Sequence, residues 1–171
     1  MLFAYGGSSN IVSDCCMSHA EKRALIILRI VVGWFFFYAG VIKVMDPAWS
    51  AAGYLNSAKT FSGLYHALAN PSVLPVINFI NEWGLVLLGL SLILGISVRI
   101  SSIAGIILMT LYYFPRLQFP HPTPTTYLID EHIIYIAVLL VFATIRTEGL
   151  SKWCAKLSFF ERYPGFRKVL E

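Results

Sequence analysis

The stretch "VINFINEWGLVLLGLSLILG", residues 76–95, decides the fold class of this chain. A bilayer-spanning helix needs about 20 predominantly apolar residues, and this run supplies them. Its apolar residues are continuous rather than alternating, which predicts a helix and excludes a membrane β-strand. Yet Glu82 lies well inside the run, with Asn78 and Asn81 within one helical turn. Because a charge in a bilayer is costly, Glu82 indicates either a functional site or a buried ion pair.

Four apolar segments are long enough to cross a bilayer: residues 24–45, 74–95, 98–114 and 127–145, the third only just. Only 13% of the residues are charged, whereas about a quarter are charged in an ordinary soluble domain. We therefore predict one all-α domain, residues 24–146, that forms an integral membrane four-helix bundle.

The two ends differ from this domain. Residues 1–23 are expected to be disordered, and they lack the basic start and apolar stretch of a signal peptide. Translation from Met1 or from Met17 both remain open. Residues 147–171 predict a basic amphipathic helix on the lipid surface rather than a nucleic-acid-binding tail. The three cysteines, two of them adjacent, do not indicate a disulfide framework.

Basic residues are distributed unevenly about the four predicted spans. With four spans, both termini share one side of the membrane with the 95–98 turn. That side carries Lys22, Arg23, Arg99, Arg146, Lys152, Lys156, Arg162, Arg167 and Lys168, against Lys43, Lys59 and Arg116 on the other. The positive-inside rule then predicts a multi-pass protein of the plasma membrane with both termini in the cytoplasm.

Both connections on the outer side are unusual. Residues 46–71, "DPAWSAAGYLNSAKTFSGLYHALANP", are too polar to span and are rich in aromatic residues. They predict short helices in the outer interface. Residues 114–127, "FPRLQFPHPTPTTY", hold four of the eight prolines. We expect this segment to be non-helical and to form a stiff cover over the outer end of the bundle.

Two of the predicted helices carry small residues on the same face as polar ones. One stripe is Arg29, Gly33, Phe36, Gly40 and Lys43, and the other is Asn78, Glu82, Leu85, Gly89 and Leu92. Small residues let membrane helices approach closely. The polar faces of these two helices are therefore expected to be their packing faces.

Several ionisable groups are expected to converge in the outer half of the bundle. Lys43 ends the first predicted helix there, Glu82 lies about 12 Å below the outer end of the second, and Glu131 and His132 open the fourth. Lys43 is the expected partner of Glu82, unless Glu82 is protonated. We favour a binding or catalytic site over a purely structural pair.

The surrounding residues receive separate interpretations. Tyr135 lies one turn below Glu131, while Arg29 lies nearer the cytoplasm, where it either joins a site or extends toward the headgroups. Capping of a helix start accounts for Asp130. No metal site is predicted, because residues 130–132 are consecutive and helical metal ligands are spaced three or four residues apart.

Three segments resemble the DoxX family of four-helix membrane proteins. They are "LRIVVGWFFFYAGVIKVMDPAWSAAGYL" (28–55), "NEWGLVLLGLSLILGISVRISSIAG" (81–105) and "IDEHIIYIAVLL" (129–140). The first is similar to DoxD, the small membrane subunit of thiosulfate:quinone oxidoreductase. The polar positions that the resemblance implies are Arg29, Lys43, Glu82, Arg99 and His132.

The resemblance implies a membrane redox subunit that binds quinone or a small sulfur oxyanion, beside a second redox subunit. Quinone is the expected cofactor and the bilayer the expected surrounding partner, and a homo-oligomer is also compatible with the sequence. Proton delivery then falls to Glu82, Glu131 and His132, and ligand binding to Arg29, Lys43, Asn78 and Tyr135. Whether this chain catalyses oxidation by itself stays open, because it shows no dedicated electron carrier.

The sequence is also compatible with two other classes of function. A non-catalytic membrane partner that assembles or stabilises another complex also suits the glycine-containing helix faces. A proton-coupled transporter is less favoured, because the inner half offers few polar groups beyond Arg29.

Overall fold

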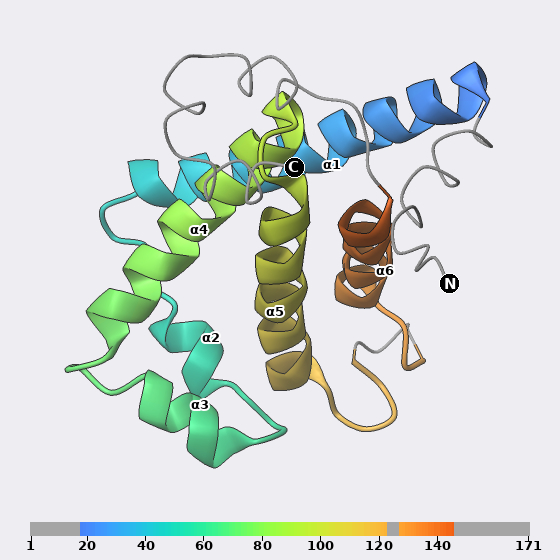
Figure 1. Ribbon diagram of the computed structural model, residues 1–171. Coiled ribbons are helices and arrows are strands. Elements are labelled where there is room, and N and C mark those ends of the chain that lie inside the picture. The colour runs from blue at the N-terminus through green and yellow to red at the C-terminus, as the bar shows by residue number, and fades with distance from the viewer. Residues whose placement is uncertain (1–17, 123–126, 146–171) are drawn as a thin grey trace, which may run out of the picture.

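The computed structural model describes residues 18–122 and 127–145. In this part of the chain all regular structure is helical, and no strand is present beyond an isolated bridge between Gln118 and His121. The helices are α1 (His19–Met45), α2 (Ala52–Asn56), α3 (Ser62–Leu68), α4 (Leu74–Leu94), α5 (Val98–Arg116) and α6 (Glu131–Thr144). The all-α prediction is therefore confirmed (Figure 1).

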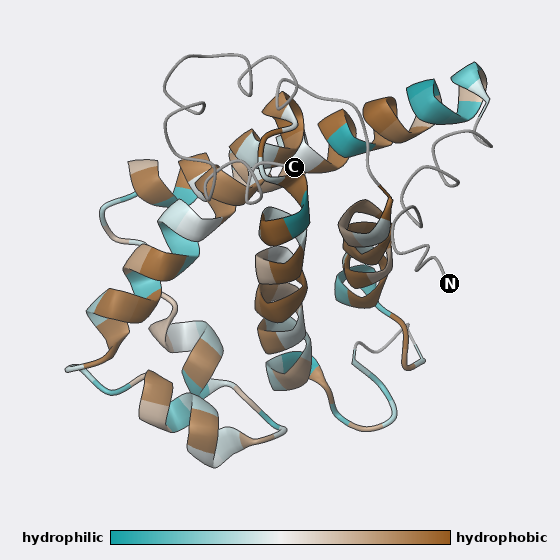
Figure 2. Ribbon diagram, viewed as in Figure 1, coloured by the Kyte–Doolittle hydropathy of each residue, from teal (hydrophilic) through white to brown (hydrophobic). Residues whose placement is uncertain are grey.

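Three of these helices, α1, α4 and α5, are long and apolar enough to cross a membrane. Helix α6 is apolar but only 14 residues long, shorter than the expected 127–145 span. Large hydrophobic side chains are exposed along the outer faces of the helices, including Trp34, Phe79, Leu87 and Ile107. Figure 2 shows that hydrophobic residues predominate along α4 and α5 and along most of α1. Such extensive exposed apolar surface is typical of a lipid-facing protein.

Helix α1 begins at His19, before the expected boundary at residue 24. Ser18 caps it: the Ser18 hydroxyl accepts from the Glu21 backbone N–H at 3.2 Å, and the Glu21 carboxylate accepts from the Ser18 N–H at 2.8 Å. This capping box satisfies two otherwise unpaired groups at the helix start. Residues 1–17 and the predicted amphipathic tail lie outside the described residues.

Helices α1 and α4 are antiparallel and in close contact through glycines. A Cβ atom on Gly89 would lie 2.2 Å from the backbone nitrogen of Phe37, and one on Gly40 would lie 2.6 Å from that of Val86. Neither position has room for a side chain. The prediction that the small-residue faces of these two helices pack together is confirmed.

Helices α5 and α6 form a second closely packed pair, and α5 also contacts α4. Their common core contains Phe36, Leu88, Met109, Leu139 and Phe142, together with Val32, Leu85 and Leu92. Helix α6 therefore joins the same core as the three long helices. Figure 1 shows α5 and α6 side by side.

The connection between α1 and α4 folds back over the C-terminal end of α5. Its buried side chains include Leu55, Ala58 and Tyr65. Two hydrogen bonds fix it there: the Lys59 N–H donates to the Pro115 carbonyl at 3.2 Å, and the Thr60 hydroxyl donates to the Leu117 carbonyl at 2.5 Å. The connection is thus an ordered part of the fold beside the end of α5.

The proline-rich segment does not begin where it was expected, because α5 continues through Pro115 to Arg116. Proline lacks the N–H that would pair with the carbonyl four residues earlier, here that of Leu111. The Tyr65 hydroxyl donates to the Leu111 carbonyl at 3.1 Å. A tyrosine from α3 thereby replaces the missing backbone donor and lets the helix tolerate Pro115.

Candidate functional site

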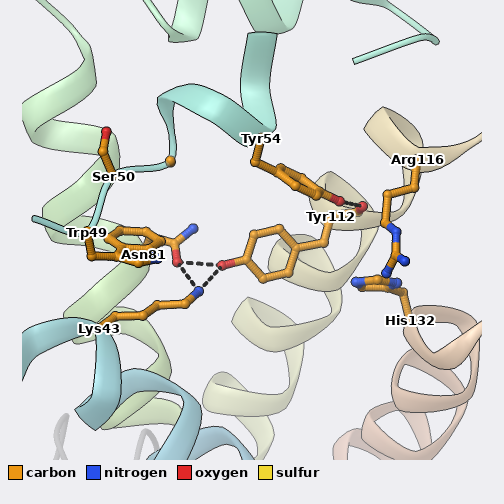
Figure 3. Close-up of a pocket in the computed structure, with 9 residues that line it drawn as sticks. Lys43, Trp49, Ser50, Tyr54, Asn81, Tyr112, Arg116 and His132 are labelled. Carbon is orange, nitrogen blue, oxygen red and sulfur yellow. Dashed lines mark hydrogen bonds between the residues drawn. The ribbon is translucent and has the colours of Figure 1, made fainter. Parts of the chain in front are cut away.

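A cavity of about 260 Å³ lies where the C-terminal ends of α1 and α5 meet the first half of α4 and the start of α6. The α1–α4 connection, not the proline-rich segment, supplies one wall. The lining residues are Lys43, Trp49, Ser50, Ala51, Tyr54, Asn81, Tyr112, Arg116 and His132. Figure 3 shows that the labelled side chains come from α1, α4, α5 and α6 and from the α1–α4 connection.

Three polar side chains from three helices meet at one wall of the cavity. The Lys43 ammonium donates to Asn81 Oδ1 at 2.8 Å and contacts the Tyr112 hydroxyl at 3.0 Å. The Tyr112 hydroxyl also donates to Asn81 Oδ1. Asn81 is buried, so its amide oxygen is a fixed acceptor for both donors.

Aromatic rings surround the Lys43 ammonium. Its nitrogen lies 4.7 Å from the ring centre of Trp49 and 5.2 Å from that of Tyr112. Both distances are within the range of cation–π attraction. Lys43 is therefore held as a cation at a largely apolar wall.

Tyr54 of α2 closes the cavity against α5. Its hydroxyl donates to the Tyr112 backbone carbonyl, and its ring meets the Tyr112 ring edge to face at 5.9 Å. Burial raises the pKa of the Tyr54 phenol above its ordinary value. Tyr54 is consequently a protonated donor that ties the connection to α5.

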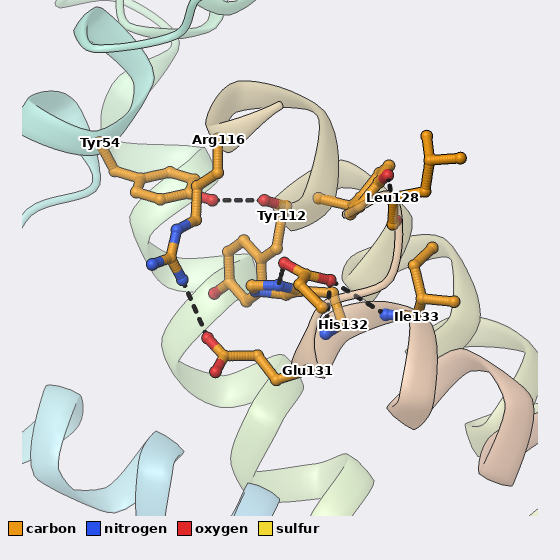
Figure 4. A network of polar contacts seen from close by, with 9 residues as sticks. Tyr54, Tyr112, Arg116, Leu128, Glu131, His132 and Ile133 are labelled. Atoms are coloured by element: carbon orange, nitrogen blue, oxygen red, sulfur yellow. Dashed lines mark hydrogen bonds and ion pairs between the residues drawn. The ribbon is translucent and has the colours of Figure 1, made fainter. Parts of the chain in front are cut away.

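On the opposite side, His132 projects from the first turn of α6. Its Nδ1 lies 2.7 Å from Asp130 Oδ2. Asp130 is the N-cap of α6, and its Oδ1 accepts from the backbone N–H groups of His132 at 3.0 Å and Ile133 at 3.3 Å. One carboxylate thus caps the helix and orients the imidazole (Figure 4).

Arg116 and Glu131 form an ion pair at the rim, with Nη1 and Oε1 separated by 2.9 Å. Their side chains are 41% and 62% exposed. Ion pairs this exposed contribute about 0–1 kcal/mol to stability. Arg116 is therefore available to a ligand at little structural cost.

Among the residues that the structure describes, the lining carries basic groups but no carboxylate. Lys43, Arg116 and His132 all border the cavity. Three acids lie near them without being part of the lining: Asp130 contacts His132, Glu131 contacts Arg116, and the negative charge of Glu82 acts on Lys43. Such a pocket suits a ligand with electron-rich oxygen atoms or negative charge.

Of the residues predicted for a site, the structure places Lys43 and His132 in the lining and Glu131 at the rim. Glu82 follows Asn81 in α4 and points about 100° away around the helix. Within the described part of the chain it makes no hydrogen bond or ion pair. Its expected partner, Lys43, forms its hydrogen bonds with Asn81 and Tyr112 instead, while the charge of Glu82 still acts on Lys43 without direct contact.

The remaining predicted residues lie beside or away from the cavity. Asn78 Oδ1 accepts from the Ala51 N–H at 3.0 Å and so positions the wall. Tyr135 stacks on Phe35 at 4.7 Å, outside the lining. Arg29 is 2% exposed, which favours packing over extension to the headgroups, and lies about 21 Å along α1 from Lys43.

Sequence reasoning missed most of the wall. It noted Asn81 as a polar neighbour of Glu82 but assigned it no role, and it placed the aromatic residues of 46–71, which include Trp49 and Tyr54, only at the interface. Arg116 was counted only as an outer charge. The spacing of apolar residues along α4 could have identified Asn81. Asn81, Leu85, Leu88 and Leu92 recur at helical spacing and form the buried face of α4, whereas Glu82 lies beside this face.

A family model described as DoxX matches residues 24–116, more than half of the chain. No curated protein and no solved structure matches the chain significantly. The matched residues include α4, α5 and almost all of α1, with Lys43, Asn81 and Tyr112, whereas Asp130 and His132 follow them. The chain is therefore a multi-pass membrane protein that belongs to the DoxX family.

Proposed function

We propose that this DoxX-family protein is a subunit of a membrane redox system and that its cavity binds a quinone headgroup. The observation that carries the proposal is the convergence of Lys43 and Tyr112 on Asn81 Oδ1 at the cavity wall. A quinone oxygen is an acceptor of the same kind as the amide oxygen, so it can accept a further N–H of the Lys43 ammonium, while the single O–H of Tyr112 stays on Asn81. The aromatic walls match the flat ring.

The size of the cavity is consistent with a small ring. Pockets for drug-sized molecules measure about 300–1,000 Å³, and this one is slightly smaller at about 260 Å³. It therefore suits a single-ring headgroup, with an isoprenoid tail in the surrounding lipid.

The residues divide the chemistry of quinone reduction between the two sides of the cavity. Reduction adds two electrons and two protons, and the electrons come from a second redox subunit. Lys43 stabilises negative charge that develops on the oxygen it faces. His132 exchanges protons on the other side, with Glu131 at the rim. Glu82 and Arg29 are not among the lining residues, and Glu82 acts on the site only through its charge on Lys43.

A small sulfur oxyanion is the second candidate ligand. The observation that favours it is the positive charge of Lys43 and Arg116, which no carboxylate among the described lining residues matches. An oxyanion would displace Glu131 from Arg116, whereas a quinone leaves that pair intact.

We also propose the membrane arrangement. Helix α6 forms the fourth span of a four-helix bundle, because it packs along α5 and buries Leu139 and Phe142 in the common core. Helices α2 and α3 lie in the outer interface of the plasma membrane, and both termini are cytoplasmic. Labelling of single cysteines in a cysteine-free background tests this: position 59 should react from outside and position 99 from the cytoplasm.

The function is tested by native mass spectrometry of the protein extracted gently from its own membranes. Wild type should retain quinone, and Lys43→Met should lose it. Lys59→Met, which removes an exposed lysine of the α1–α4 connection, is the matched control and should retain quinone. A stoichiometric protein partner with no small molecule would instead support an assembly role.

A further inference from the structure

We propose that Asp130 is a positioning residue that sets the redox-form preference of the pocket, by holding His132 in the tautomer that accepts a hydrogen bond from a hydroquinone hydroxyl. This inference rests on the proposed quinone function and deepens it. It concerns residues beyond the segment matched by the DoxX family model.

The carboxylate of Asp130 is held rigidly. Asp130 is 4% exposed, and its Oδ1 accepts from two backbone N–H groups of α6, which leaves Oδ2 facing His132 Nδ1 at 2.7 Å. An ionised carboxylate only accepts hydrogen bonds. The hydrogen between the two groups therefore belongs to Nδ1.

This arrangement determines the chemistry of the other ring nitrogen. With Nδ1 protonated, the neutral imidazole has a bare Nε2, which accepts. Figure 3 shows the ring extending from α6 toward Tyr112, and Asp130 Oδ2 contacts its Nδ1. The ring centres of His132 and Tyr112 are 6.0 Å apart. Nε2 is thus the nitrogen available to a ligand.

The cavity then has a donor wall and an acceptor wall. Lys43, held by Asn81 and Tyr112, donates on one side, and neutral His132 accepts on the other. One hydroquinone oxygen accepts from Lys43 while the opposite hydroxyl donates to Nε2. A quinone has no hydroxyl, so its second carbonyl would face a bare acceptor.

Charges around His132 come from every neighbouring element. Asp130 and Glu131 are negative, Arg116 of α5 and Lys43 of α1 are positive, and the phenols of Tyr112 and Tyr54 complete the surroundings. Protonation of the imidazole turns Nε2 into a donor. A protonated imidazole would therefore lack the acceptor on which the preference for hydroquinone rests.

Two substitutions separate positioning from helix capping. Asp130→Asn and Asp130→Ser both keep an oxygen that can cap α6, but neither presents a carboxylate to Nδ1. Asp46→Asn, a carboxylate-to-amide change at an exposed position, is the control. Binding of a short-tailed benzoquinone and of its hydroquinone is measured for all four proteins in lipid nanodiscs.

Wild type and Asp46→Asn should bind the hydroquinone more tightly than the quinone. Both Asp130 variants should reduce this ratio about tenfold, as expected for one misdirected hydrogen bond. An unchanged ratio in both Asp130 variants would overturn the proposal.

A second readout does not depend on quinone. The chain has four histidines, and His132→Gln identifies the His132 signals in ¹⁵N NMR spectra. Wild type should show the Nδ1–H form, and Asp130→Asn should shift it toward Nε2–H. An Nε2–H form in wild type would overturn the positioning role. If neither redox form binds wild type, the quinone function itself fails, while the NMR comparison still decides what Asp130 does.

Discussion

Lys43 and Asn81, 38 residues apart in the chain, are joined by a 2.8 Å hydrogen bond between Nζ and Oδ1. The same amide oxygen also accepts from Tyr112, so a single buried asparagine organises donors from two other helices. The carboxylate of Glu82, one residue further along α4, takes no part in this contact. The role of the polar residues in α4 therefore depends on the direction in which each one points.

The two adjacent positions are predicted to differ in their effect on ligand binding. Asn81→Leu should weaken quinone binding at least tenfold, because it removes the acceptor that holds Lys43 and Tyr112 in place. Glu82→Gln should change binding less than Asn81→Leu does. Titration with a short-tailed quinone compares the affinities of the two variants. A larger loss of affinity in Glu82→Gln would favour the proton-delivery role that the sequence suggested for Glu82.

Tyr112→Phe tests the hydroxyl separately from the ring. The variant keeps the aromatic surface beside Lys43 and the backbone carbonyl that accepts from Tyr54, and loses only the phenolic oxygen. Quinone affinity should fall about five- to tenfold, as for one hydrogen bond. Tyr38→Phe, at an exposed position of α1, is the control and should bind like wild type. If Tyr112→Phe and Tyr38→Phe bind quinone with equal affinity, the Tyr112 hydroxyl does not contribute to binding.

Glu131→Gln distinguishes the two candidate ligands. Loss of the exposed ion pair should change the free energy of unfolding by less than about 1 kcal/mol. If the cavity takes a sulfur oxyanion, freeing Arg116 should strengthen thiosulfate binding severalfold, and added salt should reduce the gain. Quinone binding should change less. Isothermal titration with each ligand measures both effects, and thiosulfate binding that is absent in wild type and variant alike excludes the oxyanion.

Gly89→Ala should destabilise the pairing of α1 and α4. The new methyl group would lie 2.2 Å from the Phe37 backbone nitrogen, so the helices must separate. Overpacking of this kind costs about 1–3 kcal/mol, and more when backbone is displaced. Gly84→Ala on the same helix is the matched control, because nothing lies within 4 Å of its added Cβ. Thermal unfolding in detergent should show a lower Tm for Gly89→Ala alone.

Several features of the fold were predictable from single segments. The spans 74–95 and 98–114 agree closely with α4 and α5, and the glycine faces of α1 and α4 pack together as expected. The start of α1 and the passage of α5 through Pro115 were predicted less well. Each depends on a particular partner, the Ser18–Glu21 capping box in one case and the Tyr65 hydroxyl in the other.

The site was predicted only in outline. Convergence of Lys43 and His132 followed from the order of the spans, which brings the ends of α1 and α5 and the start of α6 to the same side. The identity of the Lys43 partner did not follow. Charge complementarity suggested Glu82, but the structure places an uncharged amide and a phenol there.

The sequence by itself determined that this is a helical membrane protein with polar groups at one end, because insertion depends on the length and hydrophobicity of each segment alone. Only the tertiary structure decided which polar groups form the site. Adjacent residues on a helix point about 100° apart, so the choice between Asn81 and Glu82 depends on how α4 is rotated against α1 and α5. That rotation is set by the close contact at Gly40 and Gly89, where backbone meets backbone.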